Sequence, residues 1–205
     1  MSDFLKRINR KKTSTKSHTI NLSKKGASHS INLKKNNNEL SFNLNWSMKS
    51  TQLVNLDLDL DLGCMYRLKN GKQGVIQAIG NNFGSLKNLP FIALDKDDRS
   101  GTNIDGETLQ FSRVEELEFA VVFAFIYEGA INWKEAQGVA TIKQPNHPNI
   151  MINLNDDSSK TMVGIATLLN QNNNLKVEKL EKYYSGHRAL DEDFGFGFHW
   201  TAGSK

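Results

Sequence analysis

Residues 57–61 read Asp57-Leu58-Asp59-Leu60-Asp61, an alternation of acidic and apolar side chains with a period of two residues. Successive side chains of a β-strand point to opposite faces, so this stretch predicts a strand with leucines on one face and carboxylates on the other. Like charges along one face repel each other and weaken the sheet. A hard cation would remove that repulsion, and a donor set made only of oxygen atoms favours calcium or magnesium.

A second acidic stretch covers residues 95–107, DKDDRSGTNIDGE, in a chain whose formal net charge is +4. It does not match the EF-hand pattern. Counting from Asp95, Ser100 stands where that loop needs glycine, and Gly106 stands where it needs glutamate. What remains is an irregular acidic loop, which either wraps carboxylates and carbonyls around a calcium ion or forms a solvated turn.

Strand geometry limits which carboxylates of the first stretch can share an ion. Carboxylates two residues apart start about 7 Å from each other, whereas oxygens bound to one calcium lie roughly 2.3–2.6 Å from it. Asp59 and Asp61 are closest to the end of the run at Gly63, so they are better candidates than Asp57. A third acidic segment, residues 155–159, has an ordinary turn composition.

The rest of the chain keeps a strand rhythm, with turn signals at close intervals. An Asn-Gly turn at Asn70-Gly71 predicts a hairpin. An internal echo, residues 17–22 and 28–33 on either side of Gly26, predicts another hairpin. His18 and His29 could be metal ligands, but the matched ends of such a hairpin explain them more simply. Further predicted strands cover 40–46, 117–127, 139–142, 150–154 and 194–200, while 162–169 fits a strand or a helix. This pattern predicts an all-β fold, a β-sandwich of two antiparallel sheets with long acidic loops.

Residues 1–18 differ from the remainder in composition. They contain six basic side chains, Lys6, Arg7, Arg10, Lys11, Lys12 and Lys16, against the single acid Asp3. Such a segment buries too little apolar surface to order itself, so we predict a flexible basic N-terminal arm at 1–18 and a β-sandwich domain at 19–205. The arm either keeps the protein soluble or contacts an anionic lipid or nucleic acid surface.

Apolar runs, cysteine content and motif patterns bear on the cellular compartment and on catalysis. The longest apolar run, residues 119–127, is too short to span a bilayer. The single Cys64 excludes an intramolecular disulfide, so we expect a cytoplasmic protein. Cys64 follows an apolar strand and is expected to be buried and inert. His147 has no nucleophile beside it, and residues 80–84 lack the lysine of a phosphate loop. We therefore expect a protein that is not an enzyme.

Taken together, these motifs resemble the TerD-like tellurium resistance and stress-response family. Tyr183–His187, the aromatic tail and residues 202–205 look closest to its TerA branch. Residues 20–26 and 31–33 look like that family's opening double strand, and residues 44–46 lie where it has a Gly-Trp element. Residues 58–64 are similar to its Asp-Leu-Asp-Ala-Ser signature. Residues 97–101 and 105–107 resemble its two acidic loop motifs, and residues 123–128 its buried strand ending in Ile-Tyr-Glu.

The resemblance implies a calcium-binding β-sandwich associated with resistance to tellurite and other stress, without established catalysis. Carried over by position, the ligand candidates are Asp59, Asp61, Asp97, Asp98, Asp105 and Glu107. Two departures stand out: Ser47 follows the tryptophan where the family usually has an acid, and Gly106 replaces one carboxylate. A site with fewer charges binds calcium more weakly.

We therefore expect a non-enzymatic stress-response protein that holds Ca2+ between the strand at 57–61 and the loop at 95–107. Its expected partners are other stress-response proteins of the same system, with the inner membrane surface as a place of contact and nucleic acid disfavoured. One alternative is a polyanion or membrane-surface adaptor that acts through the basic arm at 1–18. A metal-dependent hydrolase would additionally need a general base beside the ion.

Overall fold

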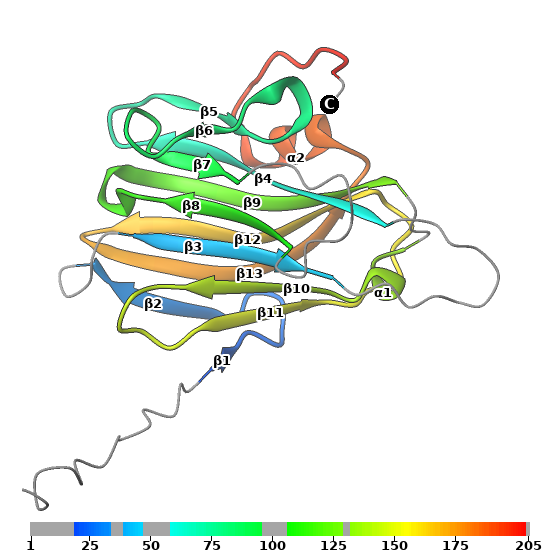
Figure 1. Ribbon diagram of the computed structural model, residues 1–205, viewed down its shortest axis with the longest axis horizontal. Coiled ribbons are helices and arrows are strands. Elements are labelled where there is room, and N and C mark those ends of the chain that lie inside the picture. Colours follow the sequence, from blue (N-terminus) through cyan, green and yellow to red (C-terminus); the bar gives the residue numbers. More distant parts are fainter. Residues whose placement is uncertain (1–18, 34–38, 47–57, 96–105, 129–131, 204–205) are drawn as a thin grey trace, which may run out of the picture.

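Two β-sheets face each other in this protein, a computed structural model of which describes residues 19–33, 39–46, 58–95, 106–128 and 132–203 (Figure 1). The seven-stranded sheet has the order β1 (Ile20–Asn21), β11 (Ile150–Leu154), β10 (Gly138–Lys143), β3 (Leu40–Asn45), β8 (Glu107–Phe111), β7 (Ile92–Leu94) and β6 (Gly84–Ser85). The six-stranded sheet has the order β2 (Ser28–Asn32), β13 (Asn174–Tyr184), β12 (Met162–Gln171), β9 (Leu117–Glu128), β4 (Asp59–Leu68) and β5 (Gln73–Ile76).

Neighbouring strands are antiparallel throughout, apart from the short parallel pair of β1 and β11. The predicted all-β sandwich is confirmed, and residues 162–169 belong to a strand. The predicted Asn-Gly hairpin is also correct: Gly71 has φ +81° and its N–H donates to Leu68 O at 2.8 Å, between β4 and β5. The long acidic loop at 96–105 lies outside the described residues.

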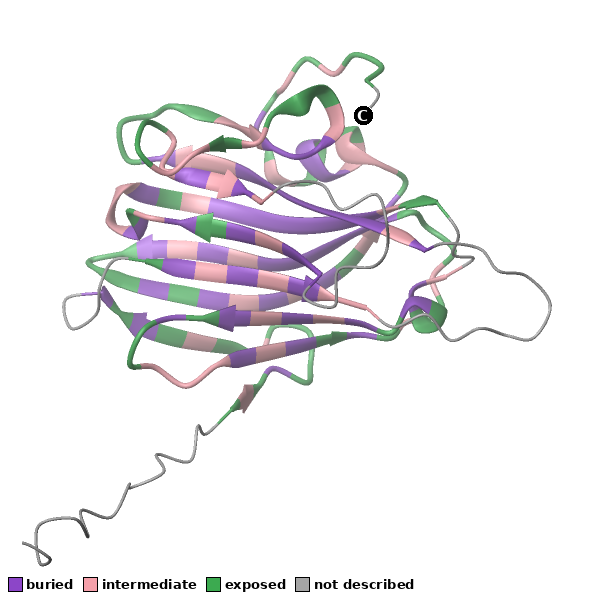
Figure 2. Cartoon of the chain, in the orientation of Figure 1, coloured by how far each residue is buried: buried purple, intermediate pink, exposed green. Residues whose placement is uncertain are grey.

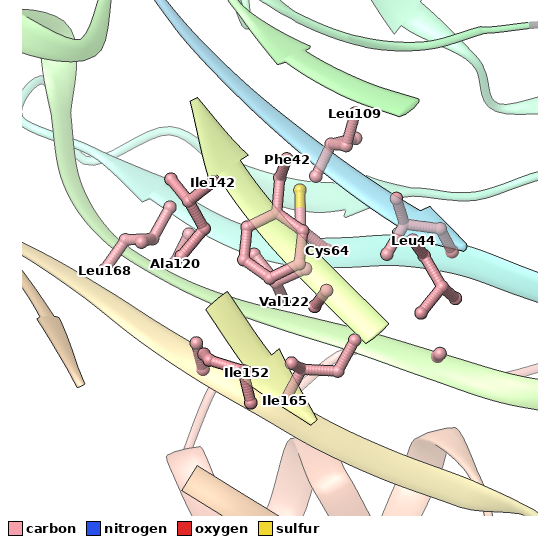
Figure 3. Packing of buried hydrophobic residues seen from close by; sticks show 14 of the residues in the cluster. Phe42, Leu44, Cys64, Leu109, Ala120, Val122, Ile142, Ile152, Ile165 and Leu168 are labelled. Carbon is pink, nitrogen blue, oxygen red and sulfur yellow. The ribbon is translucent and has the colours of Figure 1, made fainter. Parts of the chain in front are cut away.

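The main core lies between the sheets. Phe42, Leu44, Leu109, Ile142 and Ile152 come from the seven-stranded sheet, and Cys64, Ala120, Val122, Ile165 and Leu168 from the six-stranded sheet (Figure 3). Along β3 and β10, buried side chains alternate with partly exposed ones, as a strand with one covered face requires (Figure 2). Cys64 is fully buried in this core, and burial raises the pKa of its thiol.

The six-stranded sheet has a second core on its outer face, beneath helix α2 (His187–Phe194). Met65, Val121, Phe123 and Phe125 pack there with other apolar side chains of β12, α2 and the C-terminal segment. Covering both faces explains why β9 is buried along most of its length, as the apolar run at 117–127 predicted (Figure 2). Packing is tight at Gly63, where an added Cβ would lie 2.6 Å from the Phe123 ring.

The predicted strand at 194–200 is wrong. Residue 194 ends α2, and the following segment is a loop over the outer core. Asp191, which is only 4% exposed, organises this loop: its carboxylate accepts the N–H groups of Gly197 (2.7 Å), Phe198 (2.8 Å) and Trp200 Nε1 (2.7 Å). Gly195 and Gly197 have positive φ, which an extended strand does not allow.

The predicted hairpin over residues 17–33 is also wrong. β1 pairs with β11 in one sheet and β2 pairs with β13 in the other, so the segment crosses from sheet to sheet. The connection is fixed by Gly26 N–H donating to Lys179 O and Lys179 N–H donating to Ala27 O, both at 2.9 Å. Residue alternation identifies strands but does not specify their partners.

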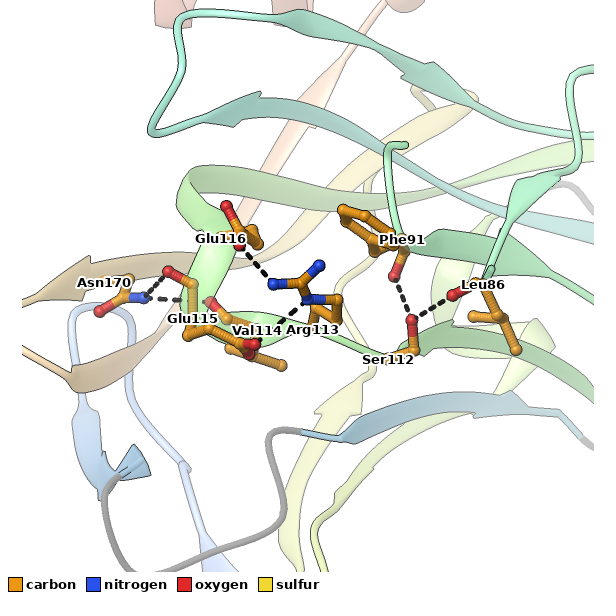
Figure 4. Close-up of polar contacts among 8 residues, drawn as sticks. All are labelled: Leu86, Phe91, Ser112, Arg113, Val114, Glu115, Glu116 and Asn170. Atoms are coloured by element: carbon orange, nitrogen blue, oxygen red, sulfur yellow. Dashed lines mark hydrogen bonds and ion pairs between the residues drawn. The ribbon is translucent and has the colours of Figure 1, made fainter. Parts of the chain in front are cut away.

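Polar contacts hold the crossover from β8 to β9, which again joins the two sheets. A single 3₁₀ turn (Val114–Glu116) makes the connection, and the Asn170 side-chain amide of β12 donates to Val114 O at 3.0 Å (Figure 4). Arg113 lies over the Phe91 ring and pairs with Glu116 at 2.7 Å (Figure 4). These contacts fix the position of β8 relative to β9 and therefore to β4.

A buried ion pair joins the sheets at another point. Lys179 (3% side-chain exposure) and Glu181 (10%) are 2.8 Å apart on β13, and Lys179 Nζ also lies 3.3 Å from the Asn153 carbonyl of β11. Glu181 has φ +42°, at a β-bulge against β12. Within the described ranges, no helix has the length and apolar character needed to cross a bilayer.

Candidate metal centre

The described residues of the predicted site lie where β4 and β8 begin, on opposite sheets. The Leu62 N–H of β4 donates to Glu107 Oε2 of β8 at 2.6 Å. β5 pairs only with residues 64–67 of β4, so Leu62 lies beyond the end of that pairing. The Glu107 carboxylate thus satisfies a backbone donor at the edge of β4, and it does so one residue away from Asp61.

Both carboxylates are inaccessible to solvent: Asp61 is 0% exposed and Glu107 is 2% exposed. The leucines of the alternating run face the main core as predicted, but the opposite face at Asp61 is covered and not solvated. Burying each of these carboxylates in a low-dielectric environment is unfavourable unless hydrogen bonds, a proton or a cation compensate it. Their donor chemistry, oxygen atoms only, fits a hard divalent cation such as Ca2+.

Asp59 stands at the first position of β4, partly exposed, with Glu128 of β9 opposite it across a β-bulge. Two acidic side chains in directly opposite positions repel each other. A cation close to this strand end would relieve that repulsion. Glu128 ends the Ile-Tyr-Glu element, but only the pairing of β4 with β9 reveals that it faces Asp59.

The two ends of the acidic loop come together beside this edge. Thr108 N–H donates to Asp95 Oδ1 at 2.7 Å, and Asp95 N–H donates to Thr108 O at 2.9 Å. Burial raises the pKa of Asp95 above its usual value, although the Thr108 hydrogen bonds act in the opposite direction. These two hydrogen bonds therefore hold Asp95 and Thr108, which flank the segment 96–105, next to each other.

Position 106 accommodates only glycine in this arrangement. It has φ +66°, and an added Cβ would lie 2.1 Å from the Leu44 carbonyl oxygen. Asn43 of β3 supports the same place, since its amide donates to Glu107 O at 3.3 Å and lies 3.2 Å from Thr108 Oγ1. Trp46 Nε1 donates to Leu58 O at 3.1 Å and anchors the approach to β4. Sequence patterns gave no signal for the supporting role of Asn43.

Of the six predicted ligands, Asp59, Asp61 and Glu107 are placed by the structure, whereas Asp97, Asp98 and Asp105 lie outside the described residues. Within the described ranges, no group of three His, Cys, Asp or Glu side chains is arranged to hold one metal ion. A complete calcium shell at this edge would therefore need further oxygen donors, and Asp97, Asp98 and Asp105 are the predicted ones.

The third acidic segment has a simpler explanation. Asp157 pairs with Lys134 at 3.3 Å and Asp156 with Lys25 at 3.9 Å, all on the surface. Such exposed pairs contribute little to stability. Their position between lysines and solvent agrees with the ordinary turn composition of residues 155–159.

Comparison with known proteins places this edge in context. No family model matches the chain. Over 197 residues, however, the chain is 36% identical to a tellurium resistance protein TerA from Alcaligenes sp., an alignment that includes 91% of this chain. The chain belongs to the TerD-like tellurium resistance family. It spans 58% of the length of that TerA relative.

Solved structures support the TerD-like fold at low sequence identity. A homologue of the telluride resistance protein TerD from Streptomyces coelicolor superposes with a TM-score of 0.51 at 13% identity, covering 75% of this chain and 94% of that one. A crystal structure of a protein of unknown function gives a TM-score of 0.52 at 14% identity, covering 77% and 95%. At these identities the likeness establishes the sandwich and its topology, and nothing further.

Proposed function

We propose that this TerD-like protein is a calcium-binding module of a tellurite and chemical stress response. One observation carries the proposal: Glu107 from one sheet contacts the backbone of the other sheet next to Asp61, with both carboxylates buried. Asp59, Asp97, Asp98 and Asp105 would complete the shell from the strand at 57–61 and the loop at 95–107. The similarity to a tellurium resistance protein supplies the stress context.

The ion would act structurally in this proposal. It would join the beginnings of β4 and β8 and set the conformation of the acidic loop, whose surface other proteins of the stress system would recognise. Binding to the folded state alone stabilises that state, so calcium should raise the melting temperature. The proposal assigns the protein no catalytic step, and it places the protein in the cytoplasm.

The test is calorimetric titration of the full chain with CaCl2, with melting curves in calcium and in chelator. Asp61→Asn and Glu107→Gln each remove one charge at similar volume, and a glutamine carbonyl can still accept the Leu62 N–H. We expect each to weaken calcium binding by at least tenfold, whereas Asp157→Asn on the surface should not change it. The absence of heat and of any melting shift in millimolar calcium would overturn the proposal.

A second role rests on the composition of residues 1–18, six basic side chains against one acid. We propose that this segment adds contact with anionic membrane surfaces. In a sedimentation assay, the full chain should bind vesicles that contain 30% phosphatidylserine at low salt. It should be released at high salt, because salt screens electrostatic attraction. Removing residues 1–18 should abolish this binding and leave calcium binding intact.

A further inference from the structure

Two histidines from opposite sheets meet at one edge of the sandwich, far from the candidate calcium centre. His29 belongs to β2 and His147 to the connection between β10 and β11, 118 positions later in the chain. Their Nε2 atoms are 3.4 Å apart, and their ring centroids are 5.2 Å apart at an interplanar angle of 58°. Both rings are partly exposed, so a solute can reach them. β2 and the β10–β11 connection lie at the same end of the molecule (Figure 1).

The tautomer of His147 is fixed by its own backbone. Its Nδ1 lies 2.9 Å from the Pro148 carbonyl oxygen, which can only accept, so Nδ1 carries the hydrogen. In the neutral ring the lone pair is then on Nε2, the atom that faces His29. A histidine held by a hydrogen bond from one ring nitrogen to a carbonyl, with the other nitrogen presented, has the arrangement usual for a metal ligand.

The separation of the two Nε2 atoms fits a shared ion. Imidazole nitrogens bind zinc at roughly 2.0–2.1 Å, and at a tetrahedral angle two such nitrogens are about 3.4 Å apart. An N–H···O hydrogen bond spans about 2.7–3.2 Å between its heavy atoms, and an N–H···N bond is somewhat longer. The observed 3.4 Å therefore fits two ligands of one ion as well as a long hydrogen bond between the rings.

The surroundings of His29 favour the neutral form of its ring, which is the form that binds a metal ion. Burial, and secondarily the charge that His147 would carry, lower the pKa of His29, so His29 is neutral at pH 7. A divalent ion that accepts one lone pair from each neutral ring would therefore displace no proton from His29, and it would add a link between β2 and the β10–β11 connection.

We propose that His29 and His147 form a two-histidine site for a borderline divalent transition-metal ion, of which Zn2+ is the test case, with water completing its coordination. Nitrogen ligands favour zinc, copper and nickel over calcium, so this site differs in chemistry from the carboxylate edge. Within the described ranges, no third His, Cys, Asp or Glu joins the pair. The affinity is therefore weaker than that of a four-ligand structural zinc site.

The test is titration of the full chain with ZnCl2 in excess calcium, which competes with zinc for carboxylate sites such as the proposed calcium centre. We expect one ion per chain and a higher melting temperature. His29→Asn and His147→Asn should each weaken zinc binding by at least tenfold, while His199→Asn, at an exposed position, should leave it unchanged. Melting curves without metal verify that each variant is folded.

Imidazole nitrogen NMR distinguishes this site from zinc bound elsewhere. On addition of one equivalent of zinc, the Nε2 resonances of both His29 and His147 should shift together. Zinc binding that survives both substitutions, or shifts confined to other histidines, would overturn the proposal. So would the absence of heat and of chemical-shift change in millimolar zinc.

Discussion

His187 provides a pH-dependent stability that can be worked out from its surroundings. Its ring lies between Phe123 (centroids 5.3 Å apart), Phe125 (5.1 Å) and Trp200 (5.2 Å). In the described part of the protein, its buried Nε2 has no hydrogen-bond partner. This burial lowers the pKa of His187 from 6.5 to about 4. The imidazolium is thus disfavoured in the folded state, which an apolar site predicts.

The sign of the effect follows from proton binding. Between pH 6.5 and 4 the unfolded chain holds a proton on this ring and the folded chain does not, so acidification favours unfolding. The contribution is negligible at pH 7.5 and reaches about 2 kcal/mol of lost stability at pH 5. It approaches about 3 kcal/mol once the pH falls below 4.

Urea unfolding of the wild type and of His187→Phe, measured from pH 7.5 to 4.5, isolates this contribution. Carboxylates titrate equally in both proteins, so the difference between the two curves reports the ring. From pH 7.5 to pH 5, the free energy of unfolding of His187→Phe should rise by about 2 kcal/mol relative to that of wild type. The pH dependence of His199→Gln should match that of wild type. Parallel curves for wild type and His187→Phe would refute the reasoning.

Three further substitutions test other features of the fold and the site. Lys179→Met leaves Glu181 buried without its cation and should lower the free energy of unfolding, measured in urea, by about 3–5 kcal/mol. Adding Glu181→Leu should recover most of this loss, and a double variant as unstable as the single one would contradict the ion-pair argument. Asp191→Ala removes the acceptor of three N–H groups and should lower the free energy of unfolding by about 3 kcal/mol. Near-ultraviolet circular dichroism of Trp200 should report the release of the C-terminal segment, and an unchanged spectrum would contradict this role of Asp191. Gly106→Ala places a methyl group against Leu44 O and should weaken calcium binding at least tenfold in calorimetry, whereas Gly26→Ala, with open space around it, should not; equal effects would show that the glycine at 106 has no special role.

The sequence predicted the strands well because alternation is a local property. β3 appears where the period-two pattern places it, β9 covers the apolar run at 117–127, β10 and β11 lie close to the predicted ranges, and the Asn-Gly turn joins β4 to β5. The partners of the strands were less accessible, since β1 and β2 pair with strands more than a hundred residues away in different sheets. The aromatic alternation at 194–200 was misread because a loop organised by one buried carboxylate, Asp191, imitates the strand period.

At the candidate site, the acidic motifs identified the predicted ligands, but only the tertiary structure shows the environment of these residues. Nothing in the alternating run indicates that Asp61 is fully buried, because its cover comes from residues elsewhere in the chain. Glu128, Asn43 and Asp95 acquire their relation to the site through strand pairing, which spans long sequence separations. The meeting of His29 with His147 is of the same kind.

Because β1 and β2 belong to different sheets, the sandwich begins at an edge of the seven-stranded sheet. Ile20 begins an edge strand of the seven-stranded sheet, four strands away from β8. At about 4.8 Å between neighbouring strands, that places Ile20 roughly 19 Å to the side of Glu107. A surface that contacts the protein close to Ile20 would therefore lie to the side of the carboxylate edge. Under the proposed function, attachment there would leave the opposite part of the sandwich accessible to calcium and to partner proteins.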